Sequence, residues 1–289
     1  MINKKRSQQA AYKEEIFMKS MKKRVMAAVL TAVMVIATFA NVVPASAASL
    51  TADQYLNKMT KAANKAASYE VKTNVVQNAT TDGQKLNTKA VSKQIVFVDP
   101  MKSKSVTTTT IKGAGLDSKT KTITYVKQNA KGKIYAYTST DGSKYEKMNM
   151  TGMVDDLNGM EIENYSNAKI VKKNVKVNKI STVQISAEVS GADLGEVLAA
   201  AGLGSTADDS EIDYSALKPV KATLWVDRKT YLPVKVSTDM TDFLNSYLPI
   251  LYQSLGTEDV SVEYSKAIST ATYSNFNHAT NFTIPKACK

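Results

Sequence analysis

Few residues in this sequence could carry chemistry. His278 is the only histidine, so a Ser-His-Asp triad would depend on it, and its polar surroundings are typical of a solvated side chain. Cys288 is the only cysteine, and we expect it in an unstructured segment that supplies neither a base nor an oxyanion hole. No Gly-rich phosphate loop, HExxH helix or CxxC pair occurs. We therefore predict that the protein is not an enzyme and uses no cofactor.

One acidic cluster could supply oxygen ligands to Ca²⁺. It consists of Asp208, Asp209, Glu211 and Asp213. The spacing lacks the glycine and the distant glutamate of an EF-hand loop, so we favour a solvated loop. The adjacent pair Asp155 and Asp156 is expected on the polar face of a short helix. We predict no metal site.

Soft apolar side chains are more informative than the acidic ones. Four methionines lie between residues 148 and 160, and methionine adapts to irregular partners on binding surfaces, although these four could equally fill a core. A helix expected at about 241–255 is apolar on most of its circumference, so a sheet or a bound lipid must cover it. The side chains predicted to line an apolar ligand site are Met148, Met150, Met153, Met160, Leu194, Val197, Leu198, Phe243, Leu244, Tyr247, Leu248 and Leu251.

The elements that would position these side chains are mostly strands. Thr51 and Gln54 have capping-box spacing, which predicts a helix from there to about Ala67. Alternation then predicts about ten strands, and Asp141-Gly142 between two of them indicates a hairpin. The predicted strand ranges are 69–75, 91–98, 103–111, 120–126, 133–138, 144–150, 169–177, 182–189, 221–226, 231–238 and 260–274, with a short edge at 282–284.

Three apolar helical segments interrupt this strand pattern. They are expected at about 151–160, at 190–202 after a Ser190 cap, and at 241–255, where Pro249 should introduce a kink. The order of elements predicts the α+β class, with strands in meander order forming one large curved antiparallel sheet, an open half-barrel, wrapped around the inserted helices. No linker rich in Pro, Gly or Ser divides the chain, so we expect a single domain at 48–289.

Residues 1–47 have the order of features of a secretory signal. Basic residues precede an apolar run at 25–40, and Ala45-Ser46-Ala47 offers small side chains to a signal peptidase. Met21 is an alternative start, in which case residues 1–20 are a mis-called extension. We predict cleavage near Ala47 and a secreted, extracytoplasmic protein. The alternative is an uncleaved anchor, although the run is short for a bilayer span.

The net positive charge of the chain is weak evidence for nucleic-acid binding. Residues 1–47 hold eight Lys or Arg and two Asp or Glu, which is half of the net charge of +12. The remaining basic residues are lysines apart from Arg228, whereas nucleic-acid binders cluster arginines for bidentate contacts. We predict no nucleic-acid partner. A weak attraction to a membrane surface or to an anionic cell-wall polymer is more plausible.

Several segments, taken in order, resemble a known group of exported proteins. Leu224–Val234 reads LWVDRKTYLPV, a strand ending in W-V-D, a basic turn and L-P opening the return strand. Tyr137–Met148 forms a strand–Asp-Gly–aromatic strand pattern, the apolar helix follows the return strand, and Tyr273–Pro285 leads a last strand into an I-P tail. This order resembles the LolA/LppX-like superfamily of exported lipid and lipoprotein carriers, in particular its Gram-positive exported branch.

The resemblance implies an open antiparallel half-barrel closed by helices, with an apolar cavity for acyl chains. Two features depart from the pattern. Ala48 stands where lipoprotein members carry a lipidated cysteine, and Arg228 lies in a turn, so the arginine that holds the lid of the lipoprotein carrier has no counterpart. The resemblance thus favours a general lipid-binding role in the bacterial envelope over lipoprotein trafficking.

Two functions follow from the sequence. The leading hypothesis is a monomeric, non-enzymatic protein that holds a lipid or an acyl chain between the sheet and the inserted helices. The alternative is a structural or interaction module of the cell surface, whose half-barrel is filled by its own side chains and whose lysines contact anionic wall polymers. The two differ in whether the space under the helices is open to a ligand.

Overall fold

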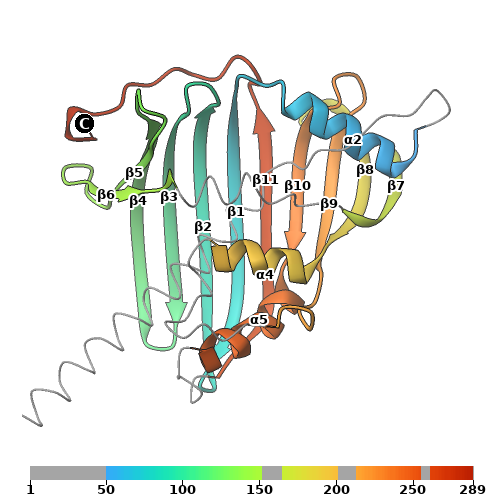
Figure 1. Cartoon of the computed structure of the whole chain (residues 1–289). Coiled ribbons are helices and arrows are strands. Elements are labelled where there is room, and N and C mark those ends of the chain that lie inside the picture. Colours follow the sequence, from blue (N-terminus) through green and yellow to red (C-terminus); the bar gives the residue numbers. More distant parts are fainter. Residues whose placement is uncertain (1–49, 152–164, 201–212, 255–260, 289) are drawn as a thin grey trace, which may run out of the picture. The chain divides into compact units, whose positions relative to one another are not determined.

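The computed structural model describes residues 50–151, 165–200, 213–254 and 261–288 (Figure 1). The chain divides into two compact units, Met1–Ile36 and Ala37–Lys289, and every described residue belongs to the second. Within that unit one eleven-stranded antiparallel sheet forms, accompanied in the described ranges by three α-helices and one 3₁₀ turn. None of the helices in these ranges is long and apolar enough to cross a membrane.

The open, curved antiparallel sheet confirms the predicted fold class. Its strands are β1 (Ser68–Thr81), β2 (Gln84–Phe97), β3 (Lys102–Gly113), β4 (Leu116–Gln128), β5 (Ile134–Ser139), β6 (Glu146–Asn149), β7 (Ser166–Val177), β8 (Ile180–Val189), β9 (Val220–Asp227), β10 (Pro233–Asp239) and β11 (Val262–Ser274). They lie in the order β6-β5-β4-β3-β2-β1-β11-β10-β9-β8-β7. The arrangement therefore consists of two meanders, β1–β6 and β7–β11, rather than the single meander that we predicted.

The two meanders are joined by β1 and β11, the first and the last strand along the chain. Val71 of β1 lies opposite Tyr273 of β11, and Val75 lies opposite Ser269. Hairpin patterns in a sequence pair a strand only with its neighbour along the chain, so they do not reveal this contact. Because of it, β1 and β11 are central strands with partners on both sides, and neither is an exposed edge.

Tight turns join the long strands. Asp82 and Gly83, at φ 49° and 76°, connect β1 to β2, the combination that suits the twist of a two-residue hairpin. The hairpin predicted at Asp141-Gly142 is confirmed, but its loop is longer, residues 140–145 between β5 and β6. There Asp141 accepts hydrogen bonds from Ser139, Ser143 and Lys144, which hold the pKa of its carboxyl well below the usual range.

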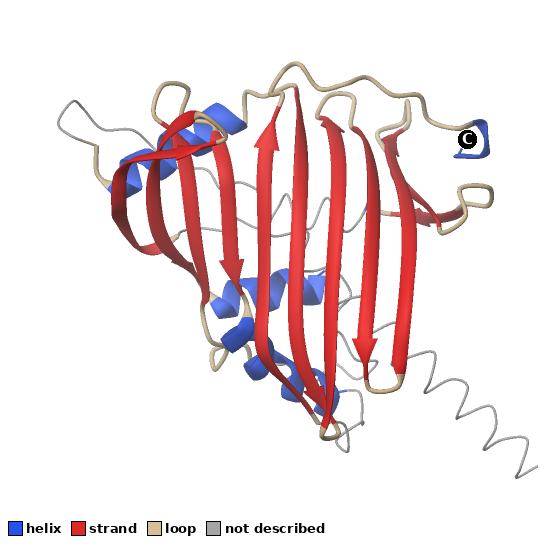
Figure 2. Ribbon diagram, turned by 180° about the vertical axis from the view of Figure 1, so that it is seen from behind, coloured by secondary structure: helices blue, strands red, loops and turns tan. Residues whose placement is uncertain are grey.

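The helices are α2 (Ala52–Ala63), α4 (Gly191–Ala200) and α5 (Thr241–Ser254). All three lie on one side of the sheet in Figure 1, and in Figure 2 the strands stand in front of them. The capping box of α2 is confirmed: Gln54 N donates to Thr51 Oγ1 over 3.3 Å, and Thr51 N donates to Gln54 Oε1 over 3.0 Å. The insertion of α4 between β8 and β9, and of α5 between β10 and β11, is also as predicted.

The segment after β11 differs from the prediction. Residues 282–284 do not form a strand; residues 275–288 instead cross the ends of β1–β4 and finish in a 3₁₀ turn at Lys286–Cys288 (Figure 1). Asn277 fixes its start, since Ala67 N donates to its side chain over 2.7 Å and its own N–H donates to Ser68 O over 2.8 Å. The segment is therefore ordered against the sheet, and the expectation of an unstructured end is wrong.

Candidate functional site

The face of the sheet on which α2 packs, called the inner face here, carries the main apolar core. Leu56 and Met59 of α2 are buried in one cluster with side chains of five strands. Its strand members are Val71, Val183, Ile185, Ala187, Ala222, Leu224, Val226, Val236, Ala271 and Tyr273. Cross-strand pairs such as Ile185 with Leu224 place these side chains on the same face. The β8–β11 side of the inner face is thus filled by α2 and by its own Val, Ile and Leu residues.

The inner face of eight strands, β1–β4 and β8–β11, carries no charged residue. Register and alternation place every charged side chain of these strands on the opposite, outer face. They are Glu70, Lys72, Lys85, Lys89, Lys93, Lys102, Lys104, Lys112, Asp117, Lys119, Lys121, Lys127, Glu188, Lys221, Asp227, Lys235, Asp239, Glu263 and Lys266. The lysines of these strands are therefore segregated to one face of the sheet.

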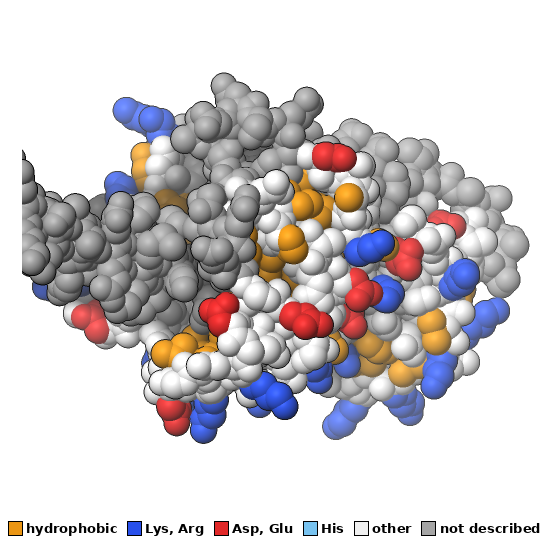
Figure 3. Space-filling view, turned by 90° about the horizontal axis from the view of Figure 1, so that it is seen from below, with side chains coloured by type: hydrophobic (Ala, Val, Ile, Leu, Met, Phe, Trp, Pro, Cys, Tyr) orange, Lys and Arg blue, Asp and Glu red, His pale blue; other side chains and the backbone are white. Residues whose placement is uncertain are grey.

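On the outer face, lysine side chains lie over aromatic rings. Lys102 Nζ is 4.5 Å from the centroid of the Phe97 ring, and Lys147 Nζ is 4.3 Å from that of Tyr135. The outer face of β1–β4 carries ten lysines and two acidic residues. Figure 3 shows a different distribution where the molecule is seen from below, with acidic, basic and hydrophobic side chains intermixed on the described part of that surface. The excess of positive charge belongs to one face of four strands.

Small hydroxyl side chains are buried on the inner face of β2 and β3. Thr88 and Ser92 of β2 and Ser103 and Thr107 of β3 are all buried, and Thr107 Oγ1 donates to Ser92 Oγ over 2.9 Å. Ala90 lies between them, 1% exposed. The cluster that contains α2 includes no residue of β2 or β3, and this part of the inner face is built from small, uncharged, partly polar side chains. It differs in kind from the aliphatic β8–β11 side.

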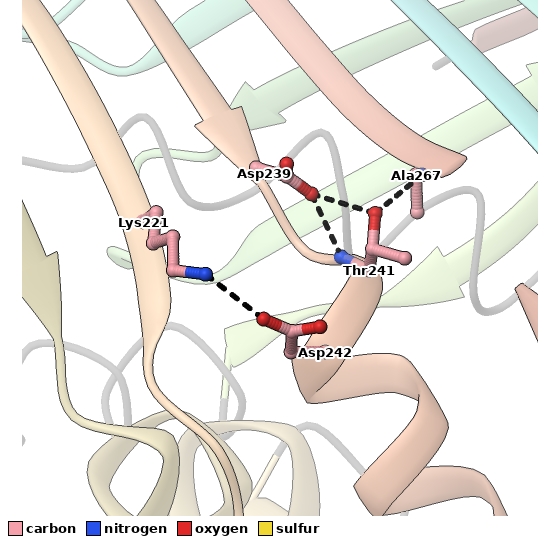
Figure 4. Close-up of polar contacts among 5 residues, drawn as sticks. All are labelled: Lys221, Asp239, Thr241, Asp242 and Ala267. Atoms are coloured by element: carbon pink, nitrogen blue, oxygen red, sulfur yellow. Dashed lines mark hydrogen bonds and ion pairs between the residues drawn. The ribbon is translucent and has the colours of Figure 1, made fainter. Parts of the chain in front are cut away.

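The start of α5 is fixed to three strands (Figure 4). Asp239 Oδ1, at the end of β10, accepts hydrogen bonds from the N–H and the hydroxyl of Thr241, over 3.1 and 2.6 Å. Thr241 Oγ1 accepts in turn from Ala267 N of β11 over 2.9 Å. Lys221 of β9 forms a salt bridge of 3.0 Å with Asp242. These contacts orient the apolar side chains of α5 relative to the sheet.

Five of the predicted lining residues lie on α5, and all five are buried. They are Phe243, Leu244, Tyr247, Leu248 and Leu251. The rings of Phe243 and Tyr247 stack, with centroids 5.5 Å apart and planes inclined by 12°. Burial is also the main cause that raises the pKa of the Tyr247 hydroxyl. The structure thus brings these residues together in the interior.

Leu194 of α4 is also buried, and residues 213–218 lie between α4 and α5. A Cβ added at Gly195 would come within 2.7 Å of both Tyr214 and Leu217 side-chain atoms, so α4 is in close contact with this segment. Lys218 N donates to Ser246 Oγ of α5 over 3.0 Å. Leu194 therefore belongs to the same part of the molecule as the α5 residues. The side chains of Val197 and Leu198 lie outside the described part of the chain.

The two predicted methionines that the structure describes, Met148 and Met150, are not buried with the α5 residues. Met148 lies on the edge strand β6 with 59% of its side chain exposed, and Met150 is half-buried after the end of that strand. Met153 and Met160 lie outside the described residues, as do Asp155 and Asp156 and the acidic residues 208–211. Asp213 is exposed and accepts from Ser215 N over 2.8 Å. His278 is exposed and holds no buried position.

Gln77 was missed in the sequence analysis. It lies on the inner face of β1, is 4% exposed, and its amide nitrogen has no hydrogen-bond partner in the part of the chain that the structure describes. The alternation of Tyr69, Val71, Thr73 and Val75 continues through residue 77, so the pattern itself places a polar amide at an inward position. A buried amide without a partner is uncommon and requires an explanation.

Cys288 is fully buried in a second apolar cluster with Tyr125 and Tyr137, in contrast to the unstructured segment that we expected. Burial raises the pKa of its thiol. We expect a thiol reagent to label Cys288 at least about 100-fold more slowly in the native protein than in urea, an opening free energy of about 2.8 kcal/mol. The measurement is the release of the reagent's chromophore over time. Equal rates in the two conditions would contradict this packing.

Asn245 joins α5 to β11 through two hydrogen bonds to the backbone of one residue. Its Nδ2 donates to Tyr264 O over 2.9 Å, and its Oδ1 accepts from Tyr264 N over 2.7 Å. We expect Asn245→Ala to lower the free energy of unfolding by about 2 kcal/mol, because both partly buried backbone groups lose their partner. Urea unfolding measures this, and Asn245→Asp, which keeps the acceptor, should fall between the two. An alanine variant as stable as the wild type would disprove the role of this contact.

Comparison with solved structures finds similar chains at low sequence identity. The lipoprotein LppX of Mycobacterium tuberculosis is 12% identical, with a TM-score of 0.38, over 78% of this chain and 95% of LppX. A DUF1329 family protein of Desulfovibrio piger is 7% identical, with a TM-score of 0.25, over 81% of this chain and 95% of the other. A β-barrel-like DUF1849 protein of Brucella abortus is 8% identical, with a TM-score of 0.23, over 75% of this chain and 99% of the other.

Two comparisons of sequence were informative to different degrees: a family model matches the chain, whereas no curated protein does. No curated protein sequence matches the chain significantly. Residues 51–289 match the family described as "Family of unknown function (DUF6612)". This match spans all of the described strands and helices and most of the chain. The protein therefore belongs to DUF6612, a family of unknown function.

Proposed function

We propose that this protein is an exported, non-enzymatic binding protein that holds an apolar ligand, a lipid or an acyl chain, on the inner face of its sheet. The observation that carries the proposal is the segregation of charge: the inner face of eight long strands is uncharged, and all their charged residues lie on the outer face. In this proposal residues 1–47 are a signal segment, and residues 48–289 form one domain outside the cytoplasm.

The composition of the inner face suits such a ligand. The aliphatic side chains of β8–β11 pack against α2, whereas β2 and β3 carry small buried residues such as Ala90 and Thr107. An acyl chain gains about 0.8 kcal/mol for each CH₂ that it buries, and needs no polar partner to do so. The buried side chains of α5 would bound one end of the site. The motif order shared with exported lipid carriers is consistent with this role.

The direct test is to look for the ligand and then to block its place. The full chain is expressed in a bacterial host, recovered from the extracytoplasmic fraction and examined by native mass spectrometry. We expect a bound lipid that is released by organic extraction, and displacement of a fluorescent fatty acid by the extracted material. A protein that carries no lipid and binds no fluorescent fatty acid would refute the proposal.

Two adjacent threonines of β3 provide a matched pair of variants. Thr109 lies on the inner face opposite Ala90, Thr110 lies on the outer face opposite Lys89, and both are half-buried. Phenylalanine at position 109 should obstruct the inner face and weaken binding of the fluorescent fatty acid, whereas phenylalanine at position 110 should leave it unchanged. Equal effects of the two substitutions would mean that the ligand does not lie on this face.

A second function is favoured by the lysines of the outer face of β1–β4. Ten lysines and two acidic residues on four adjacent strands make a surface suited to an anionic wall polymer or membrane surface. Binding of this kind is screened by salt, over about 8 Å at physiological ionic strength. Cosedimentation with cell walls that weakens steeply between low and high salt would support it. Binding insensitive to salt would exclude it.

A further inference from the structure

Gln77 occupies the middle of the inner face. Val75 and Ala79 flank it along β1, Thr88 lies directly opposite on β2, and Ala267 lies directly opposite on β11. Val75, Ala267 and Gln77 are all at least nine-tenths buried. Gln77 is thus a polar amide among small and aliphatic side chains, in a central strand with neighbours on both sides.

The amide nitrogen of Gln77 is buried and has no hydrogen-bond partner among the described residues. Leaving a buried donor unpaired lowers stability, whereas methionine or leucine at this position would not. Of the two cross-strand neighbours, Ala267 offers no acceptor, and the hydroxyl of Thr88 does not accept from Gln77. No contact within the described part of the chain therefore accounts for a glutamine at this position.

Small hydroxyl residues extend from Gln77 across the neighbouring strands. Thr88 and Ser92 of β2 and Thr107 of β3 are buried on the same face, and Ser269 of β11 lies on the other side of β1. Hydroxyl groups both donate and accept hydrogen bonds. Together with the unpaired amide, they form a polar strip within the inner face.

No charged side chain of β1–β4 or β8–β11 faces this strip. A carboxylate or phosphate buried here would lose its hydration without gaining a counter-ion from these eight strands, which is strongly unfavourable. An uncharged ester, amide or hydroxyl group would lose little, because the amide of Gln77 can donate to its oxygen. The chemistry of the strip therefore selects a neutral polar group.

We propose that the inner face binds a neutral amphiphile, such as an acylglycerol, and that Gln77 Nε2 donates a hydrogen bond to an oxygen of its ester-bearing head. This inference rests on the proposed function and names the ligand class for the same site. Acyl chains lie along the uncharged inner face, while the head group lies against Gln77 and the hydroxyl strip. The unpaired donor of the free protein is satisfied in the complex.

The test compares three probes of equal chain length on the full chain: a pyrene-labelled diacylglycerol, a pyrene-labelled fatty acid and a pyrene-labelled alkane. The variants are Gln77→Met, which keeps the length of the side chain, and Gln184→Met as a control. Gln184 is a half-buried glutamine on the outer face of β8, opposite Trp225. Thermal melting followed by circular dichroism confirms that both variants fold, and Gln77→Met should melt no lower than the wild type.

We expect the wild type to bind the diacylglycerol more tightly than the fatty acid at neutral pH. Gln77→Met should weaken diacylglycerol binding about tenfold and leave alkane binding unchanged, because one hydrogen bond is lost and the apolar contacts remain. Gln184→Met should change neither. An equal loss for the alkane, an unchanged affinity for the diacylglycerol, or a preference for the fatty acid would overturn the inference.

Failure of the proposed function gives a different result. A wild-type protein that binds the alkane without preference for the diacylglycerol overturns the role of Gln77 but leaves an apolar site in place. A wild-type protein that binds none of the three probes refutes the apolar site itself, and the inference with it. The three probes together therefore separate the ligand class from the existence of the site.

Discussion

Replacing Phe243 by alanine is expected to lower the free energy of unfolding by about 3–5 kcal/mol. The side chain of Phe243 is fully buried at the start of α5 and stacks on Tyr247. Its loss removes the apolar transfer energy of the ring and leaves a cavity next to the Tyr247 ring, which the surrounding helix and strands cannot fill without shifting. Urea unfolding followed by circular dichroism gives the difference.

Asp242, the preceding residue, provides the control for Phe243. Its carboxylate forms a salt bridge with Lys221, but the two side chains are 60% and 62% exposed. Asp242→Ala should therefore change the free energy of unfolding by no more than about 1 kcal/mol. If Phe243→Ala were as mild as its neighbour, the interior placement of α5 would be wrong.

Gly113→Ala is the second substitution with a large expected effect, a loss of about 3 kcal/mol. Gly113 ends β3 at φ +104°, and a Cβ there would lie 2.1 Å from the carbonyl oxygen of Lys85 on β2. That contact is with backbone, so no side chain can rotate away, and the ends of β2 and β3 must separate. Losing pairs such as Leu86 with Gly113 would loosen the first hairpins of the sheet.

A Gly83→Ala variant serves as the control, because it measures the cost of the left-handed backbone conformation without the steric clash. Gly83 also has a positive φ, +76°, but a Cβ there would meet nothing within 4 Å. Gly83→Ala should therefore lose only the cost of a left-handed conformation, about 1–2 kcal/mol. Chemical denaturation of both variants tests the difference. A Gly113→Ala variant no less stable than Gly83→Ala would show that β2 and β3 do not approach so closely.

The local parts of the fold could be predicted because each rests on residues close together in sequence. Thr51 with Gln54 predicts where α2 begins, and the alternation from Tyr69 to Val75 predicts the inner face of β1. The apolar pattern of α5 likewise predicts that Phe243 and Leu248 are buried. Propensity, capping and periodicity all act within a few residues, which is why they can be read without the structure.

The contacts that could not be predicted depend on residues far apart in the chain. The pairing of Val71 with Tyr273 follows from the assembly of two meanders, and no local pattern specifies it. Cys288 is buried because residues 275–288 are held across the strand ends, an effect of Asn277 and its distant partners. The candidate site has the same origin: Gln77 becomes unpaired and buried only when β2 and β11 lie on its two sides.

The central pairing of β1 with β11 also governs the order of folding. Ala67 and Asn277, which bond beside this pair, are 210 positions apart, so the closing contacts carry a large loop-closure entropy and form late. During synthesis the β1–β6 half has an unpaired edge at β1 until β11 has been made, and its sheet cannot be completed. A chain built in this way stays incompletely folded until its last strand is available.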